Sequence, residues 1–236
     1  QLLDTALGLF YRQGFHATGV DQLAAAAGLT KKTLYRYFAT KEALIDATLQ
    51  QRDEHFMAAL DAFVAATPLP QRPQAYLDYL AQWFAQPDFH GCLFINAAAE
   101  YPQADDAIHR QAAAHKARLR SWLQQCCTDA GLAEPVLRAQ QLFLLGEGLT
   151  VAAQVFAQIS DQVQVTPLVT DGERVAMHQV VATIHGSGRA ILTGERVALN
   201  YLQCISGIAT ITRRYVEAVA GTRSVILDTR EMVPGL

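Results

Sequence analysis

The stretch TGVDQLAAAAGLTKKTLYRYFATK, residues 18–41, decides the fold of this 236-residue chain. It predicts two short helices joined by a turn at Gly28, because glycine adopts the positive φ that ends a helix sharply. Thr18 and Asp21 have the spacing of a capping box, which predicts that the first helix begins near Gly19. Two short helices across so tight a turn are the layout of a helix-turn-helix unit, which inserts its second helix into the major groove of DNA.

The second helix of the pair, which Thr30 would cap, has two contrasting faces. Leu34 and Phe38 are four residues apart and are predicted to point inward. The other side chains would point outward or flank that face, and they are basic, polar or aromatic: Lys31, Lys32, Thr33, Tyr35, Arg36 and Tyr37. Such a face suits a groove lined by phosphates. The alternative is an ordinary helical hairpin with solvated Lys and Arg side chains, and the caps, the tyrosines and Lys41 make that alternative weaker.

A helix upstream of the pair completes a three-helix unit over residues 1–45. Its apolar side chains fall on one stripe, and Gly14 is expected to end it. The stripe consists of Leu2, Leu3, Ala6, Leu9 and Phe10. Charge is distributed to match: residues 1–52 hold six Lys or Arg against four Asp or Glu, whereas the whole chain has a net charge of −3. The positive charge is therefore kept at the end that would contact DNA.

Residues 46–158 have the pattern of an all-helical domain. Apolar residues recur every three to four positions from Lys41 to Thr67, which predicts a long amphipathic helix. Pro68, Pro70 and Pro73 interrupt this pattern, and a further helix is expected from Tyr76 onward. Three more helical segments are expected over residues 91–99, 107–130 and 136–158. The predicted fold class is therefore mainly α.

Three strings within this part resemble the amino-terminal signature of tetracycline-repressor-type (TetR) transcriptional regulators: FHATGV at 15–20, AAGLT at 26–30 and TLYRYFATKEAL at 33–44. The resemblance implies a ligand-gated repressor that works as a dimer on a double-stranded DNA operator. It assigns phosphate contacts chiefly to Thr18, Tyr35, Tyr37 and Lys41. It assigns the groove and the base edges to Lys31, Lys32 and Thr33. Phosphate contacts supply affinity, and base contacts supply the choice of sequence.

The string GCLFIN at 91–96, with Glu100, also resembles one branch of the same regulators, whose helical domain binds a small-molecule effector. Phe56, Tyr79 and Trp83 could line an apolar cavity there, with Cys92 and Asn96 as its polar groups. The alternative is that each of these side chains is simply part of the core, because aromatic residues at helical spacing are usually packing.

Composition narrows the setting of the protein. With 51% hydrophobic residues the chain can bury a sizeable core. No apolar run reaches the roughly 20 residues that cross a bilayer, and no membrane association is expected. The four cysteines lack the spacing of a zinc site or a disulfide framework, so we expect a reducing cytoplasm, no metal and no cofactor. Gln1 lies inside a helical pattern, and we expect an additional amino-terminal stretch before it.

The chain changes character near residue 158. Strands are predicted at Val163–Val169 and Val180–Ile184 around a turn at Asp171–Gly172. A helix is predicted over 189–220, and a buried strand at Ser224–Asp228. Residues 159–236 are thus expected to form an incomplete α+β segment.

Three strings in this segment are similar to nicotinate-nucleotide pyrophosphorylase, the quinolinate phosphoribosyltransferase family: AILTGERVALNYLQ at 190–203, SGIAT at 206–210 and ILDTR at 226–230. The resemblance implies that Arg196 would reach a neighbouring subunit's active site and that Arg230 would hold a substrate carboxylate. Glu231 departs from the family, which has Lys there. A single barrel strand also cannot form the site of a barrel enzyme. We therefore expect no enzymatic activity from this segment alone.

Two functions remain open at this stage. The first is a DNA-binding repressor whose carboxyl end has been replaced by an enzyme fragment. Its dimer would be weakened because the last dimer helix is cut short near Gln158. The second is a non-catalytic or partner-dependent fragment of the transferase, involved in NAD biosynthesis. A third possibility, that the tail is disordered, concerns residues 159–236 alone.

Overall fold

The structure is a computed structural model that describes residues 1–159, 163–169, 175–176 and 179–222. It is 71% helical, and its described residues form ten helices, one of them a 3-10 turn, and one two-stranded sheet. These residues fall into two units, one of residues 1–61 and 92–119, the other of residues 62–91 and 120–222. The mainly helical fold class is therefore confirmed. Within the described part, no helix has both the length and the apolar character that spanning a bilayer requires.

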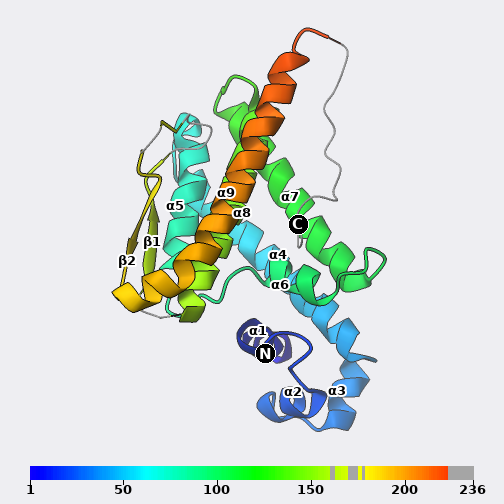
Figure 1. The fold of residues 1–236 in the computed structure, drawn as a ribbon. Coiled ribbons are helices and arrows are strands. Elements are labelled where there is room, and N and C mark those ends of the chain that lie inside the picture. The colour runs from blue at the N-terminus through cyan, green and yellow to red at the C-terminus, as the bar shows by residue number, and fades with distance from the viewer. Residues whose placement is uncertain (160–162, 170–174, 177–178, 223–236) are drawn as a thin grey trace. The chain divides into compact units, whose positions relative to one another are not determined.

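The first unit begins with three helices (Figure 1): α1 (Leu2–Gln13), α2 (Val20–Ala26) and α3 (Lys31–Tyr37). Helix α1 buries Ala6, Leu9 and Phe10, as the apolar stripe predicted. It ends at Gly14, whose φ is 85° and whose N–H donates to the carbonyl of Phe10 over 2.9 Å. This positive φ explains why the sequence has glycine at that position.

The turn between α2 and α3 has the hydrogen bonds of a Schellman motif. The Leu29 N–H donates to the Ala24 carbonyl over 2.9 Å, and the Gly28 N–H donates to the Ala25 carbonyl over 3.1 Å. Gly28 has a φ of 66°, in the left-handed region that this motif requires. The glycine turn that the sequence predicted is confirmed.

The start of α2 differs from the predicted capping box. Helix α2 does begin after Gly19, but no side chain caps it. The Thr18 hydroxyl instead donates backward to the Gly14 carbonyl over 2.7 Å, and Asp21 pairs with Lys31. The prediction of a capping box was wrong, because both side chains bind other partners.

The long helices follow in the predicted order. They are α4 (Lys41–Ala65), α5 (Arg72–Phe84), α6 (Leu93–Glu100), α7 (Ala107–Asp129) and α8 (Pro135–Ile159), with the 3-10 turn η1 (Leu69–Gln71) between α4 and α5. Helix α5 begins four residues earlier than expected. Pro73 lies in its first turn, where the missing N–H has no intrahelical partner to lose.

The second unit closes with a hairpin and one further helix. Strand β1 (Gln164–Pro167) pairs antiparallel with β2 (Ala182–His185), with Val165 opposite Ile184. Helix α9 (Gly188–Ala218) packs along α8, and β1 lies against both α5 and α8 (Figure 1). Phe156 of α8 and Ala198 of α9 share a buried cluster, on which Val165 also packs. The predicted turn at 171–172 and the predicted strand at 224–228 lie outside the described residues.

Candidate nucleic-acid interface

Helix α3 separates an anchoring face from an exposed face. Leu34 is fully buried, and Phe38, directly after the helix, is half-buried. Tyr35 is 42% exposed and Tyr37 is 61% exposed, so both phenols are accessible. The Arg36 guanidinium lies over the Tyr37 ring, 5.5 Å from its centroid, which orients that ring. The two-faced helix that the sequence predicted is present.

On the exposed face of α3, the positive charge of Lys31 is already paired with a carboxylate. The Lys31 Nζ lies 3.0 Å from Oδ1 of Asp21 on α2. The hydrogen bond to Asp21 and its negative charge raise the pKa of Lys31. Lys32, the next residue, is exposed. Of these two lysines, Lys31 is therefore held by an ion pair to α2.

The hydroxyls of the candidate site lie in different settings. Thr33 is half-buried, and its hydroxyl lies 2.9 Å from that of Thr30, the residue that caps α3 by accepting from the Thr33 N–H. Thr18 is fully buried and bonded to the Gly14 carbonyl. Its side chain therefore braces the loop between α1 and α2.

The start of α4 lies close behind α3 in the sequence. Thr40 accepts from the Ala43 N–H over 3.0 Å and so caps α4. Lys41 is the first residue of that helix and is half-buried. A capped helix start offers unpaired N–H groups and a positive dipole end, which favour a phosphate. Tyr35, Tyr37 and Lys41 thus lie within two short segments of the first unit.

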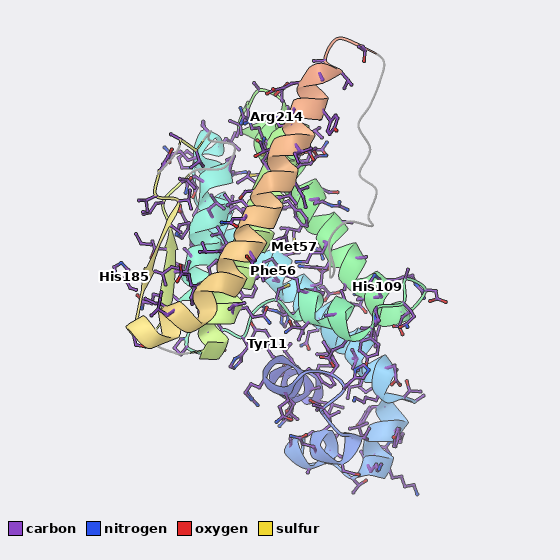
Figure 2. The ribbon with its side chains drawn as sticks, in the orientation of Figure 1. Tyr11, Phe56, Met57, His109, His185 and Arg214 are labelled. Atoms are coloured by element: carbon purple, nitrogen blue, oxygen red, sulfur yellow. The ribbon has the colours of Figure 1, made fainter. Side chains whose placement is uncertain are left out.

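The five side chains considered for an effector fall into both units. Phe56, Cys92 and Asn96 belong to the first unit, and the Lys116 Nζ lies 3.5 Å from the Cys92 Sγ. Phe56 is buried on α4 next to Met57 (Figure 2). Tyr79 and Trp83 belong to α5 in the second unit. Each contacts another aromatic ring there, Phe63 at 5.6 Å from Tyr79 and Phe89 at 5.1 Å from Trp83.

Sequence reasoning missed a buried polar cluster in the first unit. His115 of α7 is only 3% exposed, and its Nδ1 lies 2.6 Å from Oδ1 of Asp53 on α4. Arg118 donates to the other oxygen of Asp53, also over 2.6 Å. The Phe94 ring stacks on His115 with centroids 3.7 Å apart, and Phe56 meets the same imidazole edge-on. No local pattern marks this cluster, because Asp53 and His115 are 62 positions apart in the sequence.

The electrostatics of Asp53 follow from this cluster. Burial raises the pKa of its carboxyl, but the hydrogen bonds and charges of His115 and Arg118 outweigh burial and lower that pKa overall. Asp53 is therefore ionised at neutral pH, and it fixes the His115 ring beside Phe56 and Phe94. The cluster gives the interior of this unit a defined polar centre with aromatic walls.

The side chains of the two arginines implied by the transferase resemblance are not among those that the structure describes. Arg196 belongs to α9, but its side chain is not among the described ones, and Arg230 lies outside the described residues. On the described part of α9, the exposed side chains include Arg214, near the carboxyl end of the helix (Figure 2).

The two ends of the chain are similar to different known proteins. Residues 138–206 match the N-terminal domain of quinolinate phosphoribosyl transferase, a match that begins inside α8. The chain is 44% identical over 89 residues, 38% of its length and 30% of the relative, to a probable nicotinate-nucleotide pyrophosphorylase of Synechocystis. It is 36% identical over 104 residues, 44% of its length and 35% of the relative, to that of Bacillus subtilis. The chain thus spans about a third of the length of these relatives.

At the amino terminus, residues 2–48 match the tetR family of bacterial regulatory proteins. A TetR-family transcriptional regulator from Streptomyces coelicolor is 26% identical, with a TM-score of 0.63, over 89% of this chain and 92% of that one. A putative TetR regulator from Streptomyces avermitilis is 29% identical, with a TM-score of 0.59, over 66% of this chain and 85% of that one. The protein therefore carries the amino-terminal domain of the tetR regulatory proteins and has the fold of a TetR-family transcriptional regulator, joined to a segment similar to quinolinate phosphoribosyl transferase.

Proposed function

We propose that the protein is a sequence-specific regulator of transcription that binds double-stranded DNA through α3. The observation that carries this proposal is the contrast along α3, where Leu34 is fully buried while Tyr35 and Tyr37 are exposed. A helix anchored in this way presents its outer face without needing to rearrange. Lys32 and Thr33 would contact base edges, and Lys31 would join them after leaving Asp21.

The phosphate contacts would come from the flanks of this face. Tyr35, Tyr37 and Lys41 supply phenols and an ammonium group at the two ends of the segment that follows Thr30. Thr18 would contribute indirectly, because its hydroxyl is occupied by the Gly14 carbonyl. Contacts of this kind set the register of the protein on the duplex without selecting a sequence.

We further propose that a small-molecule effector releases the protein from DNA, so that it acts as a repressor in the cytoplasm. Phe56, Cys92 and Asn96 are the candidate contacts in the first unit, beside the cluster of His115 and Asp53. Tyr79 and Trp83 are the candidates in the second. An effector can change DNA affinity only by as much as it prefers one of two conformations, and the coupling is reciprocal.

We propose that two copies associate through α8 and α9. Leu192 and Leu199 are seven residues apart on α9, and Ile211 and Tyr215 are four apart, so each pair lies on one helical face. All four are exposed, between 40% for Leu199 and 73% for Leu192. Exposed Glu195 and Arg214 stand near opposite ends of the helix, so an antiparallel pair of α9 helices would bring opposite charges together.

Selection of duplexes from a random pool, followed by gel shift and gel filtration, tests the DNA-binding and dimer proposals together. The expected result is one enriched sequence with two half-sites and a dimer at micromolar concentration. Recovery of no enriched duplex would contradict the regulator. A strict monomer that still shifts the enriched duplex would contradict the dimer alone.

The transferase likeness supports a second candidate function. Residues 159–236 could pair with a complete pyrophosphorylase chain and supply Arg196 across the interface. The test is to mix the protein with a full-length enzyme whose matching arginine has been replaced by alanine, and to measure quinolinate-dependent release of pyrophosphate. Restored release supports this function, and no release at any stoichiometry excludes it.

A further inference from the structure

Glu100, the last residue of α6, is hydrogen-bonded to the loop that joins α1 to α2. Its Oε1 accepts from the Phe15 N–H over 2.9 Å, and its Oε2 accepts from the His16 N–H over 2.6 Å. The same Oε2 lies 3.0 Å from the His16 Nδ1. One carboxylate of the helical region thus takes up two consecutive backbone donors of the DNA-binding domain. These are charge-assisted hydrogen bonds, which are shorter and stronger than neutral ones.

The loop is shaped to admit this carboxylate. A Cβ atom at Gly14 would lie 2.8 Å from Oε1 of Glu100, and the φ of +85° at Gly14 would strain any other residue. Thr18 closes the loop from within by donating to the Gly14 carbonyl. Glycine at position 14 therefore both ends α1 and leaves room for Glu100.

Tyr101 extends the contact beyond the hydrogen bonds. Its ring lies 4.7 Å from that of His16 and 6.2 Å, edge-on, from that of Phe15, centroid to centroid. Phe15 is fully buried and also packs on Phe10 of α1. Burial and the nearby negative charges, Glu42 first, raise the pKa of Tyr101 to about 12, so its phenol stays neutral beside Glu100. Glu100 and Tyr101 together hold the loop by its backbone and by its side chains.

We propose that Glu100 is a positioning residue for DNA binding, holding the α1–α2 loop so that α2 and α3 keep the orientation that the duplex requires. The inference rests on the proposed DNA-binding function. Helix α6 also carries Phe94 and Asn96 and begins directly after Cys92. A displacement of α6 by a bound effector would pull the carboxylate away from the Phe15 and His16 amides and so release the loop.

Amide hydrogen exchange on the DNA-free full chain tests the contact itself. In Glu100→Ala the Phe15 and His16 amides should exchange at least about tenfold faster, the size expected for losing a hydrogen bond to a charged group. Amides within α3 should change by less than about twofold, since α3 keeps its own cap. Glu100→Gln, which keeps the shape and loses the charge, should fall between the two, and it serves if the alanine variant fails to fold. His16→Ala keeps both backbone bonds and should leave the Phe15 amide protected.

DNA affinity tests the positioning role, with the duplex selected from the random pool as the probe. Glu100→Ala and Glu100→Gln should weaken binding by at least about fivefold with an unchanged salt slope, because no phosphate contact is lost. The matched control Glu54→Gln removes an exposed carboxylate from α4 and should bind as the wild type does. Unchanged amide exchange in both Glu100 variants, or faster exchange with wild-type affinity, overturns the positioning role. A wild type that selects no duplex overturns the proposed function and this inference with it.

Discussion

Lys31 of α3 and Asp21 of α2 form an ion pair across the turn of the helix pair, with Nζ 3.0 Å from Oδ1. The pair occupies a lysine that the resemblance to TetR regulators assigns to the DNA groove. Asp21→Asn should therefore strengthen binding to the matched duplex by roughly fivefold at low salt, with a smaller gain on mismatched duplexes, because Lys31 would reach the base edges without breaking an ion pair. Titration by fluorescence anisotropy at several salt concentrations measures both. Asp88→Asn, the same charge change in the second unit, is the control, and equal gains in the two variants would show that the ion pair has no special role.

Tyr37→Phe and Lys41→Gln should weaken binding to all duplexes to a similar extent. Loss of the Lys41 charge should also flatten the salt dependence by about one unit. Lys32→Ala and Thr33→Val should instead change which sequence is preferred. Repeating the selection with each variant distinguishes the two groups, and equal effects of all four on matched and mismatched duplexes would contradict the division.

Acid should destabilise the first unit through Asp53. Its pKa is lowered in the folded state, so the folded chain binds fewer protons than the unfolded chain near pH 4. The stabilisation is therefore present above the ordinary value of 3.8 and is lost as the pH falls through the folded value. Urea unfolding followed between pH 3 and pH 6 measures this loss. Asp53→Asn should cost about 1–3 kcal/mol at pH 6 and show a smaller loss on acidification, whereas an unchanged acid profile would argue against the pair.

A charge on either of the two exposed apolar pairs of α9 should separate the proposed dimer. Leu199→Glu and Tyr215→Glu each place a carboxylate on a surface that would otherwise become buried. Analytical ultracentrifugation should then show monomers at concentrations where the wild type is dimeric, with unchanged helix content by circular dichroism. Leu168→Glu, an exposed residue just after β1, is the control and should leave the dimer intact.

Gly146 of α8 should tolerate no side chain. A Cβ there would lie 2.1 Å from the Oη of Tyr76, a fully buried residue of α5. Gly146→Ala is expected to lower the free energy of unfolding by about 1–3 kcal/mol, the range for an overpacked core. Tyr76→Phe removes the colliding oxygen, so adding it to Gly146→Ala should cost less than adding it to the wild type. Additive costs in this double-mutant cycle, measured by denaturant unfolding, would place the strain elsewhere.

Local patterns predicted the fold well wherever neighbouring residues in the sequence decide the structure. Gly14 and Gly28 end α1 and α2 as expected, and the two faces of α3 follow from the spacing of its side chains. The predicted capping box is absent, because Asp21 pairs with Lys31, ten positions away, and the Thr18 hydroxyl donates to the Gly14 carbonyl. Neither choice is visible in a four-residue pattern.

Contacts between distant segments could not be predicted from one sequence. Asp53 and His115 are 62 positions apart and Glu100 and Phe15 are 85 apart. Nothing in their immediate surroundings marks them as partners. His115 is six positions from His109, so the two imidazoles do not share a helix face, and the partner of His115 is a carboxylate on another helix. The residues assigned to the duplex and the effector stay predictions.

The resemblance of the last segment to an enzyme did not predict how helix α9 packs. The sequence indicated that the last helix of the regulator was cut short near Gln158, because the following residues resemble an enzyme. Yet α9 packs along α8, with Ala198 in the buried cluster around Phe156. Packing of this kind needs small and apolar residues at helical spacing, and the enzyme-like segment has them.

The packing of the enzyme-like helix α9 along α8 has a consequence for how regulators with this fold can diverge. A helix that seals a bundle is under selection for shape and hydrophobicity, whereas a helix that reads DNA is under selection for individual side chains. Recombination that exchanges the terminal helix for an amphipathic helix from another protein can therefore preserve the rest of the fold. The new lineage would keep its old target on the chromosome while acquiring a new surface on which pairing with other subunits can evolve.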